Sequence, residues 1–274
     1  MEQMTLFVNK ISIKSLLFIT ALVFLSAFSF YVKGEKWKLV WADEFNYTGL
    51  PDSTKWSFEV GGQGWGNNEL QYYTDADTNN AVVKNGYLSI TARREVKGKN
   101  QYTSARLITK GKKVFKYGKI EVRAKLPEGV GTWPAIWMLG DNINEVGWPD
   151  CGEIDIMEHV GFKKDSVFGS LHTKSFNHVI GTQITKGVFI KDPYQSFHIF
   201  SIEWSPKKID FFLDHKKYLE FPNQYKTVDK WPFNQPFFMI LNLAIGGNWG
   251  GQQGIDDSIF PATMQVDYVR VYKK

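Results

Sequence analysis

The sequence predicts an all-β fold, a sandwich of two packed antiparallel sheets. Three observations lead to this fold class. No long segment after residue 36 has helical periodicity, short stretches of alternating apolar and polar residues recur, and turn-forming residues separate those stretches. Many short strands joined by polar turns are typical of two sheets arranged as a jelly roll. The chain has 274 residues, and we place one compact domain at residues 35–274.

The N-terminal segment is expected to be a secretory signal peptide. Residues 15–32 carry no charge and follow Lys10 and Lys14, and residues 27–29 (Ala-Phe-Ser) form a small-x-small cleavage site. We therefore expect residues 1–29 to be removed and the protein to be secreted or periplasmic. If the segment is not cleaved, its apolar run is long enough to anchor the protein in a membrane.

Alternation of side chains predicts the individual strands. In residues 116–129, apolar residues at 120, 122, 124 and 126 alternate with charged residues, as in a strand with one buried and one solvated face. Similar patterns predict strands within residues 86–95, 197–204, 209–214, 236–247 and 264–274. Turn-forming residues stand at 84–86, 127–129, 205–207 and 213–215.

Charge and cysteine content limit the classes of function. The net charge is +5, and the lysines are scattered without an arginine-rich run, so we expect no nucleic-acid partner. Cys151 is the single cysteine, which excludes an internal disulfide. The stability of the domain must then come from a large core. We also expect the protein to be a monomer.

An acidic stretch, GEIDIMEH, is the most informative part of the sequence. Glu153, Asp155 and Glu158 stand among isoleucines on what we expect to be a strand. In a regular strand, Glu158 would point to the same side as Ile154 and Ile156, where an unpaired carboxylate is very costly. One extra residue, a β-bulge around residues 156–157, would return Glu158 to the side of the other two acids.

Three acids on one side of a strand suit glycoside hydrolysis. That reaction needs one ionised carboxylate to attack the anomeric carbon and one protonated carboxyl to protonate the leaving oxygen. We assign Glu153 as the nucleophile, Asp155 as its partner and Glu158 as the acid/base. Side chains that converge from one strand lie close together, which predicts retention of configuration. A solvated surface strand and a calcium cluster are the alternative interpretations of the same acids.

Aromatic residues and a histidine lie near the acids in the sequence. Trp133 and Trp137 flank a predicted Pro-Ala turn just before the acidic strand and suit stacking on sugar rings, although burial in the core is the alternative for each. His172 is expected on the next strand, beside the acids. No second histidine stands at zinc-ligand spacing and no Gly-x-Ser-x-Gly segment is present, which argues against metallohydrolases and serine hydrolases. Cys151 could act as a thiol nucleophile, but a lone buried cysteine is usually inert.

Taken with these residues, the sequence resembles glycoside hydrolase family 16 and, within it, the laminarinases, which are endo-β-1,3-glucanases. The resemblance extends from residues 41–45 (WADEF) to residues 266–272 (VDYVRVY). GEIDIMEHVG is similar to the bulged form of the family's acidic signature. Further similar segments are WGNNELQYYT, SARLIT, WPAIWML, GSLHT and NLAIGGNWGG.

The resemblance implies roles for individual residues and a curved jelly roll whose concave face is an open substrate cleft. Glu153, Asp155 and Glu158 match the nucleophile, the assisting acid and the acid/base. The implied substrate-binding residues are Trp133, Trp137, His172, Asn68, Arg106 and Trp249. We expect that no cofactor is required for catalysis, whereas the resemblance implies a structural Ca²⁺ at Glu44, Gly86 and Asp267.

The expected function is that of a secreted, retaining endo-β-1,3-glucanase acting on laminarin-type β-glucans. One alternative is a non-catalytic β-glucan-binding protein of the same fold, although such relatives typically lack one or both glutamates. Another is a family member that acts on mixed-linkage glucan, agarose, carrageenan or porphyran. The sequence leaves the linkage preference and the extent of transglycosylation open.

Overall fold

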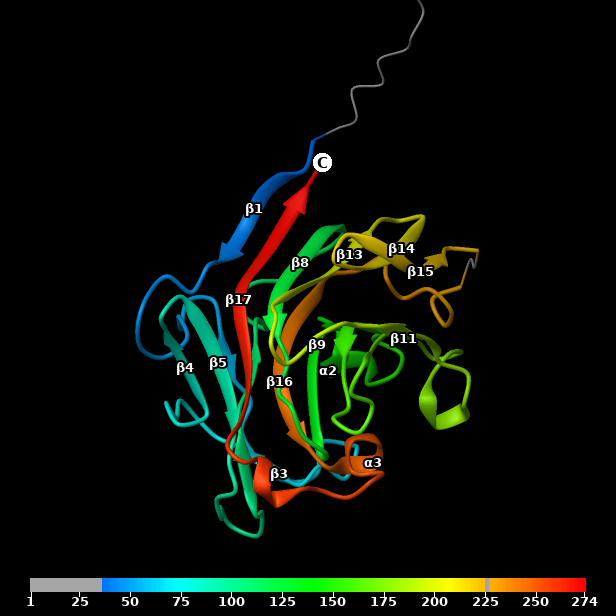
Figure 1. Ribbon diagram of the computed structural model, residues 1–274. Coiled ribbons are helices and arrows are strands. Elements are labelled where there is room, and N and C mark those ends of the chain that lie inside the picture. Colours follow the sequence, from blue (N-terminus) through cyan, green and yellow to red (C-terminus); the bar gives the residue numbers. More distant parts are fainter. Residues whose placement is uncertain (1–35, 225–226) are drawn as a thin grey trace, which may run out of the picture. The chain divides into compact units, whose positions relative to one another are not determined.

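A computed structural model describes residues 36–224 and 227–274, and the predicted signal peptide at residues 1–29 lies outside the described residues. Residues 37–274 form one compact unit. Within the described residues, two antiparallel sheets make up most of this unit, and the predicted β-sandwich is confirmed (Figure 1). No helix in the described part of the chain is long and apolar enough to cross a membrane.

The first sheet has eight strands among the described residues. Its order is β15 (Lys216–Pro222), β14 (Lys208–Leu213), β13 (His198–Trp204), β8 (Gly118–Lys125), β17 (Ala262–Lys273), β5 (Tyr87–Ala92) and β4 (Ala81–Lys84), with β1 (Lys38–Asp43) also paired to β17. Central strands such as β8 bury alternate side chains against the other sheet, as their sequence pattern predicts.

The second sheet carries the acidic stretch and has seven strands among the described residues. Its order is β12 (Ile184–Phe189), β11 (Ser166–His172), β10 (Glu153–Glu158), β9 (Thr132–Gly140), β16 (Phe237–Ile245), β7 (Arg106–Ile108) and β2 (Ser57–Phe58). A short parallel pair is formed by β3 (Gln71–Tyr73) and β6 (Tyr102–Ser104). The helical elements of the described chain have three or four residues each: α2 (Ile143–Val146), α3 (Gly247–Gly250), η1 (His178–Ile180) and η2 (Asp257–Ile259).

Each stretch that the sequence predicts as a strand contains one: β5, β8, β13, β14, β16 and β17. Two of the predicted turns are tight hairpins. Asn85 and Gly86 join β4 to β5 with φ angles of 56° and 81°, and Asp214 and His215 join β14 to β15 with φ angles of 47° and 67°. Positive φ at both central residues is characteristic of the hairpin turn whose twist matches that of the strands.

The predicted Pro-Ala turn between Trp133 and Trp137 is wrong. Residues 132–140 form the continuous strand β9, which pairs along its whole length with β16. The backbone oxygen of Pro134 accepts a hydrogen bond from His159 at 3.2 Å, so Pro134 turns its nitrogen toward the end of β10. The missing N–H therefore costs the ladder with β16 nothing, and the proline is tolerated in a central strand.

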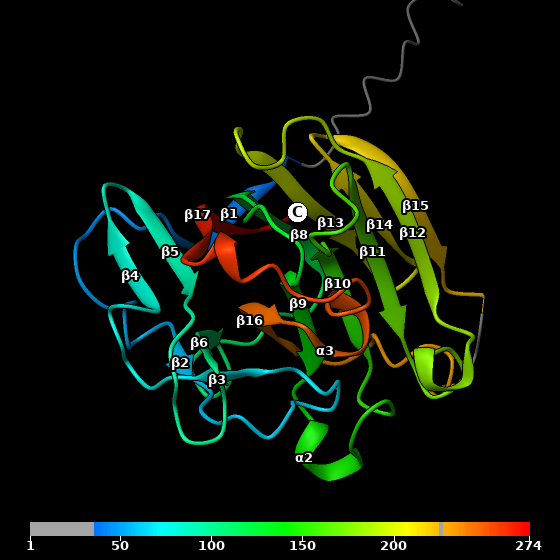
Figure 2. The ribbon, with the colours of Figure 1, turned by 60° about the horizontal axis from the view of Figure 1, so that its bottom comes forward.

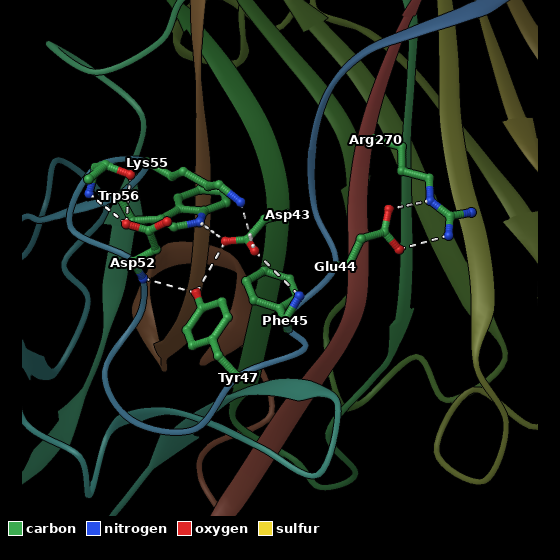
Figure 3. A network of polar contacts seen from close by, with 9 residues as sticks. Asp43, Glu44, Phe45, Tyr47, Asp52, Lys55, Trp56 and Arg270 are labelled. Carbon is green, nitrogen blue, oxygen red and sulfur yellow. Dashed lines mark hydrogen bonds and ion pairs between the residues drawn. The ribbon is translucent and has the colours of Figure 1, made fainter.

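The core lies between the two sheets. It includes Ile154, Ile156 and Met157 of β10 together with Val122 of β8 and Val269 of β17, all nearly or fully buried. Near the N-terminal strand, buried Asp43 closes a polar network (Figure 3). Its carboxylate accepts hydrogen bonds from the Trp56 indole at 2.9 Å and the Tyr47 hydroxyl at 3.3 Å, and pairs with Lys55 at 3.2 Å. These contacts tie the end of β1 to the segment before β2.

Candidate active site

The bulge predicted in the acidic strand is confirmed. Opposite β9, Asp155 pairs with Trp137 and Met157 pairs with the adjacent Ile136, so Ile156 is the extra residue. The pairing with β11 shifts over the same interval. Ile156 and Met157 both lie in the core, whereas Glu153, Asp155 and Glu158 line one cavity on the opposite face. The extra residue therefore brings Glu158 to the side of the other two acids.

Each glutamate receives a hydrogen bond from a tryptophan. The Trp148 indole donates to Oε2 of Glu153 at 3.0 Å, and the Trp133 indole donates to Oε1 of Glu158 at 3.1 Å. The hydroxyl of Ser170 on β11 donates to the other oxygen of Glu158 at 3.4 Å. An indole N–H can only donate, so these contacts favour the ionised form of each glutamate without adding a charge.

His172 lies directly opposite Glu153 in the register of β10 and β11. Its Nε2 is 3.6 Å from Glu153 and 3.3 Å from Oδ2 of Asp155. Ligand atoms of these three residues lie within 4.8 Å of one another, close enough to surround a cation. Within the described residues, Oδ2 of Asp155 and Nδ1 of His172 are buried without a hydrogen-bond partner.

Burial raises the pKa of all three acids. The pKa of Glu153 rises to about 8, mainly through desolvation and then through the charge of Asp155, while His172 and the Trp148 N–H act in the opposite direction. Burial and the charge of Glu158 raise the pKa of Asp155 well above its ordinary value, and Asp155 shares a hydrogen bond with Glu153. Burial also raises the pKa of Glu158.

The three carboxyl groups therefore cannot all be ionised at neutral pH. The pKa of about 8 for Glu153 includes the repulsion from ionised Asp155. When Asp155, the most buried of the three, holds a proton, that repulsion is absent, the proton can be directed at Glu153, and the anion of Glu153 is favoured. The raised pKa of Glu158 keeps a second proton available there. The cluster can thus present an anion and a proton donor side by side on one face of the strand.

The acids line a cavity of about 310 Å³ on the second sheet. Figure 2 shows the neighbouring strands β9, β10 and β16, with α3 beside β9 and β16. The other side chains in its walls are mostly aromatic or polar: Trp65, Trp133, Trp137, Trp148, Asn67, Glu69, Arg106 and Asn242. The guanidinium of Arg106 lies between the rings of Trp65 and Trp137, 4.9 and 4.7 Å from their centroids. Nε of Arg106 donates a hydrogen bond to the carboxylate of Glu59, which fixes the guanidinium at the cavity wall.

The structure brings most of the expected substrate-binding residues to this cavity. Trp133, Trp137 and Arg106 line it, and His172 contacts the acids. Trp249 packs edge-on against Trp133, with ring centroids 5.7 Å apart. Asn68 instead lines a neighbouring, more open hollow, where its side chain donates to Asn248 at 2.8 Å.

The cavity wall also contains residues that were not expected from the sequence, including Trp65, Glu69, His178 and Asn242. Asn242 stands in an apolar run that reads as core, and its position opposite Ala135 on β9 is a consequence of strand pairing. The ring of His178 packs on Trp148 at 5.1 Å. The alternation of Glu69, Gln71 and Tyr73 was the available signal for a polar strand face.

The thiol alternative is not supported by the position of Cys151. Its side chain is fully buried in a small apolar cluster with Leu139, Phe238 and Ile240. Burial, together with the charge of Glu153, raises the pKa of the thiol to about 12. A thiol with this pKa is protonated at neutral pH and is a poor nucleophile.

The residues expected to bind calcium lie away from the acids. Both oxygens of Glu44 accept hydrogen bonds from Arg270 at 2.8 Å, and Asp267 pairs with Arg123 (Figure 3). Gly86 lies in the turn between β4 and β5. Because a cation needs available carboxylate oxygens, this arrangement does not fit a calcium site built from these side chains. Calcium binding stays a prediction, which melting curves with added Ca²⁺ or a chelator can test.

Comparison with known proteins identifies a family with this architecture. The model of glycosyl hydrolases family 16 matches residues 67–270. The chain is 53% identical to the beta-glucanase of Rhodothermus marinus over 248 residues, 88% of this chain and 87% of that protein. The X-ray structure of the laminarinase from Rhodothermus marinus superimposes with a TM-score of 0.85 at 53% identity, covering 87% of this chain and 98% of that one. A glucan endo-1,3-beta-glucosidase of Cryptopygus antarcticus is 39% identical over 262 residues, 90% of this chain and 95% of that protein.

Proposed function

Because the chain belongs to glycosyl hydrolase family 16, we propose that it is an endo-β-1,3-glucanase that hydrolyses laminarin-type β-glucans with retention of configuration. The observation that carries the proposal is the bulge in β10, which gathers three carboxyl groups on one face of the strand. The similarity to a beta-glucanase, a laminarinase and a glucan endo-1,3-beta-glucosidase supports the choice of substrate.

In the first step, the ionised carboxylate of Glu153 attacks the anomeric carbon of the scissile sugar. Protonated Glu158 gives its proton to the glycosidic oxygen, and the bond to the leaving chain breaks as the bond to Glu153 forms. The Trp148 N–H, with the proton held by Asp155, stabilises the negative charge on Glu153 before the attack. The product of this step is a glycosyl ester on Glu153.

In the second step, Glu158 has lost its proton and acts as the base. It takes a proton from a water molecule, the water oxygen attacks the anomeric carbon, and Glu153 leaves as a carboxylate. The Trp133 N–H and the Ser170 hydroxyl stabilise ionised Glu158 between the two steps. Two inversions at the same carbon give net retention of configuration.

The aromatic walls of the cavity suit a carbohydrate substrate. The rings of Trp65, Trp133 and Trp137 offer apolar surfaces for the C–H faces of sugars, and Arg106 offers N–H groups for hydroxyls. A non-catalytic glucan-binding protein would not need two glutamates that are each held by a donor. Activity on mixed-linkage glucan or on galactans is left to the substrate test.

The decisive experiment is an assay of purified protein on laminarin, curdlan, lichenan, agarose and carrageenan. We expect the fastest release of reducing ends from laminarin, and exclusive activity on a galactan would refute the substrate assignment. NMR of the first products should show the β anomer. Glu153→Ala and Glu158→Ala should each lower kcat by roughly a thousandfold or more with an unchanged melting profile; normal turnover by either variant would refute its assigned role.

Secretion is proposed from the sequence of residues 1–29, with membrane anchoring as the alternative if that segment is retained. Expression of the full chain with fractionation and N-terminal sequencing tests this: a mature protein that begins near residue 30 supports secretion. Light scattering of the purified enzyme tests the expected monomer.

A further inference from the structure

A row of buried polar side chains leads from the segment before β3 into the cavity wall. Glu69, Gln71 and Tyr73 alternate along an extended segment, so they project to the same side. Gln71 and Tyr73 are fully buried, and Glu69 is 8% exposed and lines the cavity. Buried polar groups in such a row need hydrogen-bond partners, and they find them on β16 and on one another.

A chain of hydrogen bonds joins this row to Trp137. The Trp137 indole donates to Oδ1 of Asn242 at 2.6 Å, and Nδ2 of Asn242 donates to the Tyr73 hydroxyl at 3.0 Å. The Tyr73 hydroxyl in turn donates to Oε2 of Glu69 at 3.3 Å. The two ends, Glu69 and Trp137, are far apart in the sequence and are linked only in the folded protein.

The direction of this chain is fixed by chemistry. An indole N–H can only donate, so the oxygen of the Asn242 amide must face Trp137 and its NH₂ must face Tyr73. Burial raises the pKa of Tyr73 far above its ordinary value, so its hydroxyl keeps its proton. Because the Tyr73 oxygen already accepts from Asn242, the hydroxyl proton is available to donate to Glu69. Glu69, the last group in this series of hydrogen bonds, must therefore be an acceptor.

Gln71 imposes the same requirement on Glu69. The backbone N–H of Ile245 donates to Oε1 of Gln71 at 2.7 Å, which turns the NH₂ of Gln71 toward Glu69. That NH₂ donates to Oε2 of Glu69, also at 2.7 Å. One oxygen of Glu69 thus accepts from two buried donors, and a carboxylate satisfies both.

We propose that Glu69 is a positioning residue that fixes the orientation of the Trp137 indole through Tyr73 and Asn242. Trp137 lies opposite Asp155 in the β9–β10 register and carries the Arg106 guanidinium on its ring. Its orientation therefore sets the surface on which substrate rests beside the acids. This role rests on the proposed glucanase activity and concerns binding of the glucan rather than the chemical step.

The kinetic test removes one hydroxyl from the middle of the chain. Tyr73→Phe keeps the ring but leaves Asn242 and Glu69 without a link, and we expect KM for laminarin to rise about fivefold to twentyfold while kcat stays within about threefold. Glu69→Met should act like Tyr73→Phe, whereas Glu69→Gln, which keeps an acceptor oxygen, should change KM less than about threefold. The matched control is Tyr72→Phe on the neighbouring residue, which should change neither constant.

A double-mutant cycle separates positioning from a general loss of stability. In a Trp137→Phe background, where the indole N–H is gone, Tyr73→Phe should change KM by less than about twofold. If its effect on KM is the same in both backgrounds, Tyr73 does not act through Trp137 and the proposal is overturned. An unchanged KM for Tyr73→Phe in the wild-type background would overturn it as well.

A second measurement does not depend on activity. In isotope-labelled protein, the indole N–H resonance that disappears in Trp137→Phe belongs to Trp137. Tyr73→Phe and Glu69→Met should shift that resonance, and Tyr72→Phe should not. A Trp137 resonance that neither Tyr73→Phe nor Glu69→Met shifts overturns the proposal. If wild-type protein fails to cut laminarin but the resonance moves as expected, the proposed function fails and the positioning role stands.

Discussion

The two indole donors give the sharpest test of the catalytic roles. Trp148→Phe removes the hydrogen bond to Glu153 and keeps a ring that can pack on His178. Trp133→Phe removes the hydrogen bond to Glu158 and keeps a ring next to Trp249. Each substitution deletes a donor that favours the ionised carboxylate, so each should raise the pKa of its own glutamate.

The size of the shift follows from the geometry. A hydrogen bond to a charged group contributes roughly 1.5–3 kcal/mol, and one pKa unit corresponds to about 1.4 kcal/mol. The side chain of Glu153 is 14% exposed, so water can replace the lost donor only in part. His172 remains next to the Glu153 carboxylate in the variant, which limits the rise in the pKa. We therefore expect each pKa to rise by about one unit.

The assay is the pH dependence of kcat/KM on laminarin, measured from about pH 4 to about pH 9, because its two limbs report the free enzyme. If Glu153 must be ionised, Trp148→Phe moves the acidic limb upward by about one unit and leaves the basic limb in place. If Glu158 must be protonated, Trp133→Phe moves the basic limb upward. The reasoning is refuted if each variant moves the other limb, or if neither limb moves in variants that remain folded.

Three further predictions concern stability and reactivity. The pKa of Glu153 is raised to about 8 in the folded state, so the stability that its protonated carboxyl contributes is present below the unfolded pKa and is lost as the pH rises through 8. Glu153→Gln should reduce the decrease in the free energy of unfolding between pH 5 and pH 8, measured by urea titration, by roughly 3–4 kcal/mol, and identical pH profiles would contradict this. The Cys151 thiol should react with a disulfide reagent only after unfolding in guanidinium, and rapid labelling of active enzyme would show that it is accessible. Asp43→Ala should lower the free energy of unfolding by about 3 kcal/mol, because it leaves Lys55 and the Trp56 N–H unpaired. We expect little change in kcat/KM at temperatures where the variant is folded. Asp52→Ala is the control and should cost less, because the Asp52 carboxylate accepts from Thr54 at an exposed site and its link to Tyr47 is made by the backbone N–H (Figure 3).

Local patterns in the sequence were sufficient to predict the fold class and the β-bulge that gathers the three acids. The alternation of apolar and polar residues along 116–129 and 264–274 is a property of each strand alone, so it can be recognised without knowing which strands pair with it. The bulge was predictable for a similar reason, because a regular strand would have buried Glu158 among isoleucines. The Pro-Ala turn was predicted wrongly because the tolerance of Pro134 depends on where the partner strand β10 ends.

The all-β class, the strand positions and the gathering of Glu153, Asp155 and Glu158 on one face follow from the sequence alone, because they depend on the period of the side chains and on the cost of burying charge. Which donors reach those acids depends on the folded protein, because Trp148 approaches from a loop and Trp133 from a neighbouring strand. The link between Glu69 and Trp137 likewise forms only in the folded protein. Contacts of this kind depend on which strands become neighbours in the sheet, and that is settled by packing across the whole core.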